Sequence, residues 1–293
     1  MIFLTGSNGF VGKNIINDFG TDGIIQYKRE DDLRIDTASI VIHLAGKAHD
    51  IQNTISPDEY YQMNTLLTRN VFDAFLASQS KVFITLSSVK ACADIVAEVL
   101  TENHQANPCT EFGKSKLLAE QYIFSKKISE GKRVYVLRPC MIHGYGNKGN
   151  LNLLYKMVSK NIPWLLGAFE NKRSFCSIDN LMFIIKELIE RDDIPSGIYN
   201  VADDEPISTN ELIELIGYSQ NRKPRIWKIS KGLIKWVALI GDRMHLPINT
   251  ERIEKLTCSY VVSNSKIKNA IRKSLPVSSS EGLLKTFNYL NDL

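Results

Sequence analysis

The stretch Met1-Ile2-Phe3-Leu4-Thr5-Gly6-Ser7-Asn8-Gly9-Phe10-Val11-Gly12 decides the fold of this chain. It begins as an apolar run of strand length, passes three glycines, and is followed over residues 13–19 by apolar side chains at helical spacing. A strand, a glycine turn and a helix in this order are typical of a phosphate site. Glycines bring backbone N–H groups close to a phosphate, and the helix starts with its positive dipole end there. The spacing is G-x-x-G-x-x-G rather than the commoner G-x-G-x-x-G. Its context predicts a nucleotide site formed by Gly6, Asn8, Gly9, Phe10, Val11 and Gly12.

Composition limits the class of protein. With 293 residues, 44% hydrophobic and 23% charged, the chain is long enough for one large α/β domain with a smaller appendage, or for two modest domains. A net charge of +4 is too small to indicate nucleic acid. No signal peptide precedes the first strand and no apolar run approaches the ~20 residues of a membrane span, so we expect a cytoplasmic protein. The five cysteines are odd in number and have no C-x-x-C pair, which favours a reducing compartment and argues against disulfides or a metal site: Cys92, Cys109, Cys140, Cys176 and Cys258.

Strands and helices alternate along the first half of the chain. Apolar runs at 23–27, 39–46, 81–86 and 133–137 predict further strands, and residues 56–80 and 111–123 predict helices. This alternation predicts a doubly wound parallel sheet of the Rossmann type. Beyond residue 140 the alternation loosens. We therefore expect a nucleotide-binding domain at 1–140, with returning segments near 174–202, and a smaller lobe formed mainly by 141–293.

Several predicted strands end in residues suited to a ligand, because open parallel sheets bind ligands beyond the carboxyl ends of their strands. Leu44, Ala45 and Gly46 close the third strand, and small residues there let a cofactor lie against the backbone. Ser87 and Ser88 close the fourth. His43 and His49 lie nearby, but a histidine at a strand end is more often a packing or capping residue, so neither is assigned a chemical role.

The second predicted strand ends in Lys28-Arg29, followed by Glu30, Asp31 and Asp32. An acid at this position is typical of NAD binding, whereas a nearby arginine favours the 2′-phosphate of NADP. Because the bases come first, the sequence leans slightly towards NADPH.

A basic stretch lies between Ile216 and Gly241, which contains six bases and no acid. It is either a rim that attracts a phosphorylated substrate or, the favoured interpretation, a solvated face. Within it, residues 233–240 have the spacing of an amphipathic helix, which either touches a membrane or, as is more common, packs on a core.

Taken together, the motifs resemble the extended short-chain dehydrogenase/reductases that act on sugar nucleotides. The similarity covers nearly the whole chain, and its landmarks are Thr5 to Gly12, His43 to Gly46, Asn64, Ser87-Ser88, Gly113-x-Ser115-Lys116-x-x-x-Glu120, Arg138-Pro139 and Arg173-x-x-x-x-x-Asp179. A finer similarity points to bacterial 4-keto-reductases that make UDP-N-acetyl-quinovosamine or UDP-N-acetyl-fucosamine for surface polysaccharides. It lies in His143, Gly149-Asn150, Pro163-Trp164, Arg173-Ser174 and Asn264-Ser265-Lys266. UDP-sugar 4-epimerases share almost all of these landmarks.

The resemblance implies roles for single residues. Lys116 matches the lysine that holds the nicotinamide ribose and lowers the pKa of a catalytic tyrosine, and Ser88 matches the hydroxyl residue that bonds the sugar oxygen at C4. Asn64 matches a cofactor-site residue. Arg173 and Asn150 are implied for the substrate diphosphate or sugar. The resemblance also implies a homodimer formed through the helices at 58–79 and 112–130.

Position 112 departs from the family, because Phe112 stands where the tyrosine of the Tyr-x-x-x-Lys motif belongs. Phenylalanine keeps the ring and removes the proton-transferring hydroxyl. Three explanations compete: a deliberate tyrosine-to-phenylalanine replacement, a natural variant that uses water or another donor, and a binding-only relative. Lys116, Ser88 and the glycine turn are intact, which favours an enzyme framework that lacks its acid. The alternative from another class is a silent NAD(P)-binding regulator or scaffold.

Overall fold

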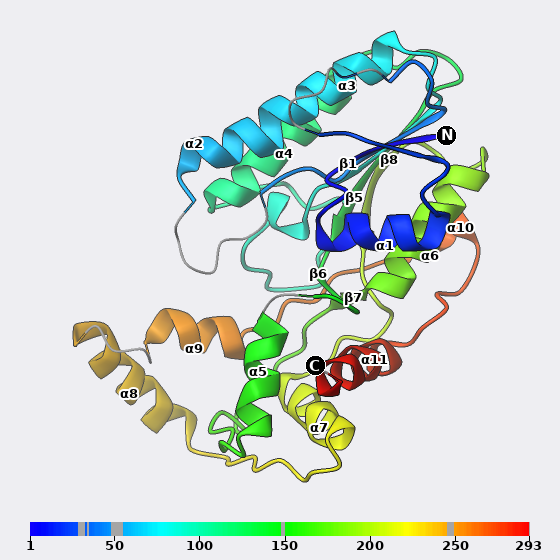
Figure 1. The fold of residues 1–293 in the computed structure, drawn as a ribbon. Coiled ribbons are helices and arrows are strands. Elements are labelled where there is room, and N and C mark those ends of the chain that lie inside the picture. The colour runs from blue at the N-terminus through cyan, green and yellow to red at the C-terminus, as the bar shows by residue number, and fades with distance from the viewer. Residues whose placement is uncertain (29–32, 34, 48–54, 148–149, 245–248, 293) are drawn as a thin grey trace.

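A computed structural model of the chain describes residues 1–28, 33, 35–47, 55–147, 150–244 and 249–292. Its centre is a six-stranded, wholly parallel sheet with the strand order β2-β1-β3-β4-β5-β8 (Figure 1). The strands are β1 (Ile2–Thr5), β2 (Ile24–Gln26), β3 (Ile40–His43), β4 (Val82–Leu86), β5 (Arg133–Pro139) and β8 (Gly197–Val201). The order reverses at β1, as in a doubly wound nucleotide-binding sheet, so the predicted Rossmann-type fold is confirmed.

Alternate side chains of the strands feed two separate cores. Phe3, Val41 and Phe83 point to one face and pack with Phe72 and Phe75, whereas Leu4, Ile42 and Ile84 point to the other and pack with Ile15 and Leu181. The first face is covered by α3 (Leu67–Ala77) and α4 (Glu111–Ser125), and the second by α1 (Phe10–Phe19) and α6 (Ile178–Glu190). Burial on both faces explains why these strands read as continuous apolar runs.

The predicted helix at 56–80 begins as expected and is then interrupted. Ser56 caps α2 (Pro57–Tyr60), since its hydroxyl accepts from the backbone N–H of Glu59 at 3.3 Å, and Pro57 takes the first position. A π-helical segment, η1 (Tyr61–Leu66), follows before α3. Such segments insert one residue into a helix and are frequent at functional sites. Here the inserted turn contains the buried Asn64.

Most of the rest of the chain forms a lobe beyond the sheet, in the lower part of Figure 1. The short parallel strands β6 (Met141–His143) and β7 (Phe175–Ser177) lie between this lobe and the sheet. Leu212, Ile216, Leu283 and Phe287 belong to its core. Its helices are α5 (Asn150–Ser159), α7 (Thr209–Ser219), α8 (Lys231–Arg243), α9 (Thr250–Thr257) and α11 (Ser279–Asn291). Helix α10 (Ser265–Ile271) instead packs beside β8 and α6, in the core on one face of the sheet. Within the described residues, no helix has the length and apolarity that a membrane crossing needs.

Candidate active site

The glycine turn after β1 is tightly packed on its inner side and open at its tip. Gly6 has φ +73°, and a Cβ on it would lie 2.7 Å from the backbone N of Ala45. A Cβ on Gly12 would lie 2.2 Å from the carbonyl oxygen of Gly6, so both positions need glycine. Asn8 and Gly9, at the tip, are exposed. Residues 10–12 begin α1, with Phe10 and Val11 half-buried, so the start of the helix faces the open tip.

The end of β3 is tied to the glycine turn and to η1 by a buried hydrogen-bonded line. The hydroxyl of Thr5 contacts Nδ1 of His43 at 2.7 Å, and Nε2 of His43 contacts the hydroxyl of Thr68 at 2.9 Å. The Thr5 oxygen also accepts from the backbone N–H groups of Leu44 and Ala45, at 3.2 and 3.1 Å. His43 is thus a structural residue, in agreement with the sequence analysis, and His49 lies outside the described residues.

Asn64 joins the loop after β3 to α4. Its Oδ1 accepts from the backbone N–H of Lys47 at 2.8 Å, and its Nδ2 donates to the hydroxyl of Ser115 at 3.0 Å and to the Lys47 carbonyl at 3.2 Å. The amide is fully buried in this position. Asn64 therefore holds the two segments that carry Gly46 and Lys116.

Lys116 lies where three of these segments meet. Its Nζ donates to the carbonyl of Leu86, the last residue of β4, at 2.9 Å. A Cβ on Gly46 would lie 3.2 Å from that Nζ and 2.7 Å from Oδ1 of Asn64, so a larger residue at position 46 would displace one of these side chains. Burial lowers the pKa of Lys116 to about 8, although the nearby carboxylate of Glu120 acts in the opposite direction. Glu120 is itself bound by Arg138, whose Nε donates to it at 2.9 Å.

The two serines after Leu86 have different surroundings. Ser88 is half-buried, and its hydroxyl accepts from the backbone N–H of Lys90 at 3.2 Å, which caps the short helix η2 (Val89–Ala91). Ser87 is 9% exposed, and its hydroxyl has no hydrogen-bond partner among the described residues. A buried hydroxyl without a partner is costly and often marks a place where another molecule binds. Both serines are two residues or fewer from the carbonyl that Lys116 binds.

Phe112 lies one helical turn before Lys116 on α4, half-buried, with its ring edge-on to Tyr60 at 6.0 Å between centroids. The beginning of α4 is firmly anchored. The Thr110 hydroxyl accepts from the backbone N–H of Gly113 at 3.2 Å, and a carboxylate oxygen of Asp94 accepts from the backbone N–H groups of Cys109 and Thr110 at 2.7 and 3.1 Å. The ring at position 112 is thus held in place, but it offers no proton.

Tyr260, which sequence reasoning missed, fastens the C-terminal lobe to the segment after Ser88. Its hydroxyl donates to the carbonyl of Ala93 at 2.6 Å, and burial raises its pKa. Its backbone pairs with Lys172 and Ser174 on either side of Arg173, at 2.8 and 3.0 Å. Arg173 is therefore held close to this segment, and burial lowers its pKa. No local sequence signal links Tyr260 to Ala93, 167 positions earlier in the chain.

Other predicted site residues are placed less fully. Lys28 is exposed beyond β2, and Arg29 lies outside the described residues. Asn150 begins α5, but its side chain is not among the parts that the structure describes. The described residues contain no group of three or more histidine, cysteine, aspartate or glutamate side chains that would hold a metal ion.

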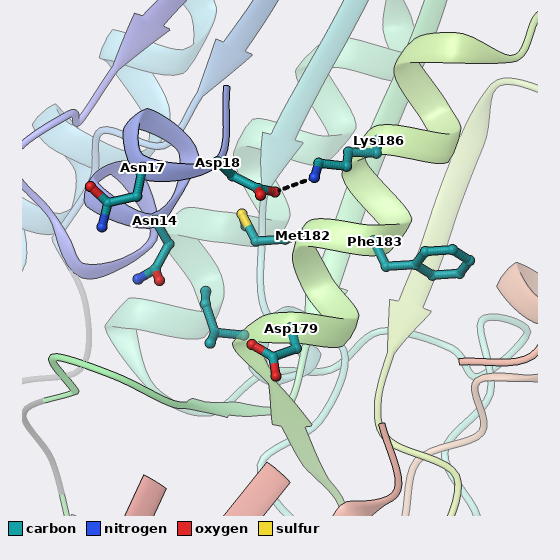
Figure 2. Close-up of a pocket in the computed structure, with 8 residues that line it drawn as sticks. Asn14, Asn17, Asp18, Asp179, Met182, Phe183 and Lys186 are labelled. Atoms are coloured by element: carbon teal, nitrogen blue, oxygen red, sulfur yellow. Dashed lines mark ion pairs between the residues drawn. The ribbon is translucent and has the colours of Figure 1, made fainter. Parts of the chain in front are cut away.

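A separate cavity of about 350 Å³ opens between α1 and α6, and none of the predicted site residues lines it. Figure 2 shows Asp18 facing Lys186, with 2.8 Å between the carboxylate oxygen and the ammonium nitrogen. Asp179, at the start of α6, pairs with Lys285 at 2.7 Å. Both carboxylates are therefore compensated by a cation within the protein.

Comparison with known proteins identifies the family. The sequence pattern of the NAD dependent epimerase/dehydratase family matches residues 2–202, which include the glycine turn, Asn64, Ser88 and Lys116. The chain belongs to this family. It is 26% identical to a UDP-glucose 4-epimerase of Vibrio cholerae, over 97% of this chain and 94% of the relative. It is 27% identical to an N-acetyl-α-D-glucosaminyl-diphospho-ditrans,octacis-undecaprenol 4-epimerase of Escherichia coli O157:H7, over 76% and 73%. A GDP-6-deoxy-D-mannose reductase of Pseudomonas aeruginosa is 25% identical, over 73% and 78%.

Solved structures show the same fold. A tyrosine-to-phenylalanine mutant of the UDP-glucuronic acid 4-epimerase of Bacillus cereus, in complex with UDP-4-deoxy-4-fluoro-glucuronic acid and NAD, superimposes with a TM-score of 0.76. It is 16% identical, with 99% of each chain covered. RMD from Pseudomonas aeruginosa complexed with NADPH gives 0.73 at 20% identity, over 100% of this chain and 99% of that one. Family and fold together give this protein the framework of a nicotinamide-dependent enzyme of sugar nucleotides.

Proposed function

We propose that this protein binds NAD(P)H and a UDP-sugar and reduces a UDP-4-keto-6-deoxy-N-acetylhexosamine at C4, as a step in the synthesis of surface-polysaccharide precursors. Phe112 keeps its rate low. NADPH is slightly favoured over NADH because of Lys28 and Arg29. Residues 1–140 and the returning segments near 174–202 serve the cofactor, and 141–293 mainly serve the sugar nucleotide. The protein works in the cytoplasm as a homodimer formed through the helices at 58–79 and 112–130.

The observation that carries this proposal is the meeting of Gly46, Asn64 and Lys116 beside Leu86, the residue that leads directly into Ser87 and Ser88. The glycine turn lies at the same carboxyl edge, joined to it through Thr5 and Ala45. The residues fit a dinucleotide. Asn8 and Gly9 in the turn are exposed, so a phosphate can approach the turn and the start of α1. The buried Ser87 hydroxyl has no hydrogen-bond partner among the described residues and can bind the ligand.

In this arrangement the nicotinamide, when bound, supplies the hydride that reaches sugar C4. The protein's own residues bind and orient. The Lys116 ammonium donates a hydrogen bond to the nicotinamide ribose. It reaches the carboxyl edge of the sheet, since it donates there to the Leu86 carbonyl. The Ser88 hydroxyl donates to the oxygen at C4 and holds it against the cofactor. Arg173 and Asn150 hold the substrate diphosphate or sugar, a task for which the fork of a guanidinium is well suited.

Phe112 removes the group that would give a proton to the oxygen at C4, so in this chain the proton that completes the reduction comes from water. Loss of a positioned general acid costs ~10²–10⁴-fold in rate. Because the ring, the helix start and Lys116 all remain, ligand binding is retained while turnover is slow.

A UDP-sugar 4-epimerase is the nearest alternative function, and the similarity to the Vibrio cholerae relative over 97% of this chain favours it. The two activities differ in their redox balance. A reductase releases oxidised cofactor in equal amount with its product, whereas an epimerase retains NAD and shows no net redox change. The alternative from another class is a non-catalytic NAD(P)-binding regulator or scaffold.

Restoring the hydroxyl tests the proposal. Phe112→Tyr should raise turnover of a 4-keto UDP-sugar by ~10²–10⁴-fold. Turnover is measured as the loss of absorbance of the reduced nicotinamide, in parallel assays with NADPH and with NADH. A matched control is Phe183→Tyr on α6, whose ring lines the separate cavity between α1 and α6 and where the rate should not change.

If the Phe112→Tyr protein turns over no 4-keto or 4-hydroxy UDP-sugar, yet still binds NADPH by fluorescence titration, the binding-only alternative replaces the enzyme. If it interconverts 4-hydroxy UDP-sugars without net oxidation of added cofactor, the epimerase replaces the reductase.

A further inference from the structure

Helix α8 has two apolar faces, only one of which packs on the protein. Ile234, Ala238 and Gly241 are buried, and the first two belong to the core of the C-terminal lobe. On the other side of the helix the large apolar residues are exposed, with Leu233 at 52%, Trp236 at 61% and Leu239 at 61%. A surface helix normally shows solvent a polar face. Here the outward face is apolar, and the sequence pattern alone does not reveal this.

The outward residues form a continuous stripe, defined here as the α8 stripe. At 100° per residue, positions 233, 236, 237, 240 and 244 fall on one side of the helix, within about 100° of its circumference, and Leu239 lies about 60° beyond them. Val237 and Met244 are exposed, and Ile240 is half-buried. Trp227, just before the helix, is 52% exposed as well. Scattered apolar residues on a surface are ordinary, but a contiguous group with two tryptophans marks an interaction surface.

The same segment carries concentrated positive charge. Six bases between Ile216 and Gly241 are all exposed, and none forms an ion pair with a residue that the structure describes: Arg222, Lys223, Arg225, Lys228, Lys231 and Lys235. The Arg222 guanidinium donates to the carbonyl of Ser159, at 2.8 Å, and the Lys231 ammonium lies over the ring of Phe169 at 5.8 Å. The whole chain has a net charge of only +4, so this charge is local. A solvated face has charges of both signs, whereas this segment has one sign only.

Both features together fit one occupant, an anionic lipid surface. Interfacial helices bury an apolar face that includes tryptophan just below the headgroups, while lysine and arginine around it attract anionic lipids. With 13 residues α8 is too short to cross a bilayer, so it would lie along its surface. We propose that α8, its apolar stripe and the basic segment before it dock this protein onto an anionic membrane surface.

The position of α8 permits this contact. Figure 1 shows α8 and α9 at the outer edge of the C-terminal lobe, on the side away from the sheet. A second copy of the chain is the less fitting occupant, because two basic segments facing each other repel. The proposed homodimer also uses α3 and α4, which cover a different part of the protein. The inference does not depend on which sugar the protein uses.

The experiment is co-sedimentation of the full chain with vesicles. Vesicles of phosphatidylcholine with phosphatidylglycerol should bind the protein, vesicles of phosphatidylcholine alone should bind it at least roughly tenfold less, and added salt should release it. Leu233→Ser with Trp236→Ser, and separately Lys228→Gln with Lys235→Gln, should each weaken binding by roughly tenfold or more. The matched control is Leu153→Ser on α5, which is 60% exposed and should change nothing.

All substituted residues are exposed, so the thermal midpoint and circular dichroism should match those of the parent; if one pair fails to fold, the other still tests the proposal. The proposal is overturned by equal binding to both kinds of vesicle, by absence of binding, or by full binding of both variant pairs. It is also overturned if Leu233→Ser with Trp236→Ser converts a dimer into a monomer in sedimentation velocity without lipid, since a second copy would then cover the stripe.

Discussion

The hydroxyl of Thr5 donates its proton to Nδ1 of His43, and this single contact fixes the direction of a hydrogen-bonded line through the site. The Thr5 oxygen already accepts two backbone N–H groups, from Leu44 and Ala45, so its own proton is left for the histidine. His43 must then carry its proton on Nε2 and donate it to Thr68, which in turn donates to the carbonyl of Asn64. The glycine turn and η1 are thereby locked to each other.

Replacing His43 by phenylalanine should destabilise the protein. The ring volume is kept, but the buried hydroxyl of Thr5 loses its acceptor and that of Thr68 loses its donor. Leaving a buried polar group unpaired costs about 1–3 kcal/mol, and urea denaturation should show a loss of that size in the free energy of unfolding. His104→Phe is the control, because His104 is exposed and bonds only locally to Thr101. Equal stability of the parent and His43→Phe would show that the hydrogen bonds from Thr5 through His43 to Thr68 do not stabilise the fold.

The same histidine makes the parent sensitive to acid. Burial lowers the pKa of His43 to about 3, from 6.5 in an unfolded chain. Between these values the unfolded state binds more protons, so the free energy of unfolding decreases as the pH falls from 6.5 towards 3. In His43→Phe this contribution is missing, and the stability difference between the two proteins should shrink as the pH falls through that window. A difference that stays constant with pH would contradict the lowered pKa.

Lys116 should make the free energy of unfolding depend on pH in the alkaline range. Its pKa of about 8 lies below the 10.5 of the unfolded chain, so the free energy of unfolding should rise as the pH increases from 8 to 10.5. The difference of about 2.5 units corresponds to at most about 3 kcal/mol. Lys116→Met should lack this rise, and the parent-minus-variant difference removes the titration of other groups. If both proteins respond to pH in parallel over this range, Lys116 is not buried as described.

How much of the site could be predicted depended on whether the signal was local in the sequence. The glycine turn, the Ser56 cap and the alternation of strands and helices each depend on residues close together in the sequence, and the structure confirms them. The π-helical turn at Asn64 was not foreseen, because one inserted residue hardly disturbs the apolar spacing from Tyr60 to Phe75. Tyr260 was missed because its partners, Ala93 and Lys172, are brought to it only by the folded chain.

In helix α8, the sequence predicted the helix but not which of its faces is buried. Apolar spacing predicts a helix over 233–240, and the structure has one from Lys231 to Arg243. Spacing does not say which apolar face turns inward, since that depends on the partner helices. The buried residues are Ile234 and Ala238, whereas Leu233 and Trp236 remain outside. The interpretation that this segment packs on a core is therefore correct for one face only.

The glycine turn offers the last test, because its packing leaves no room for a methyl group at Gly12. Alanine is the better helix former by ~1 kcal/mol, so Gly12→Ala would stabilise α1 if propensity alone decided. Its Cβ would lie 2.2 Å from the Gly6 carbonyl oxygen, a backbone atom that cannot move away cheaply, so we expect a loss of about 1–3 kcal/mol in unfolding free energy. The displaced turn should also bind NADPH more weakly by fluorescence titration. Gly23→Ala is the control, since nothing lies within 4 Å of its Cβ and it should leave both measurements unchanged. Unaltered stability and NADPH affinity in Gly12→Ala would mean that the turn is looser than the close approach of Gly6 and Gly12 indicates.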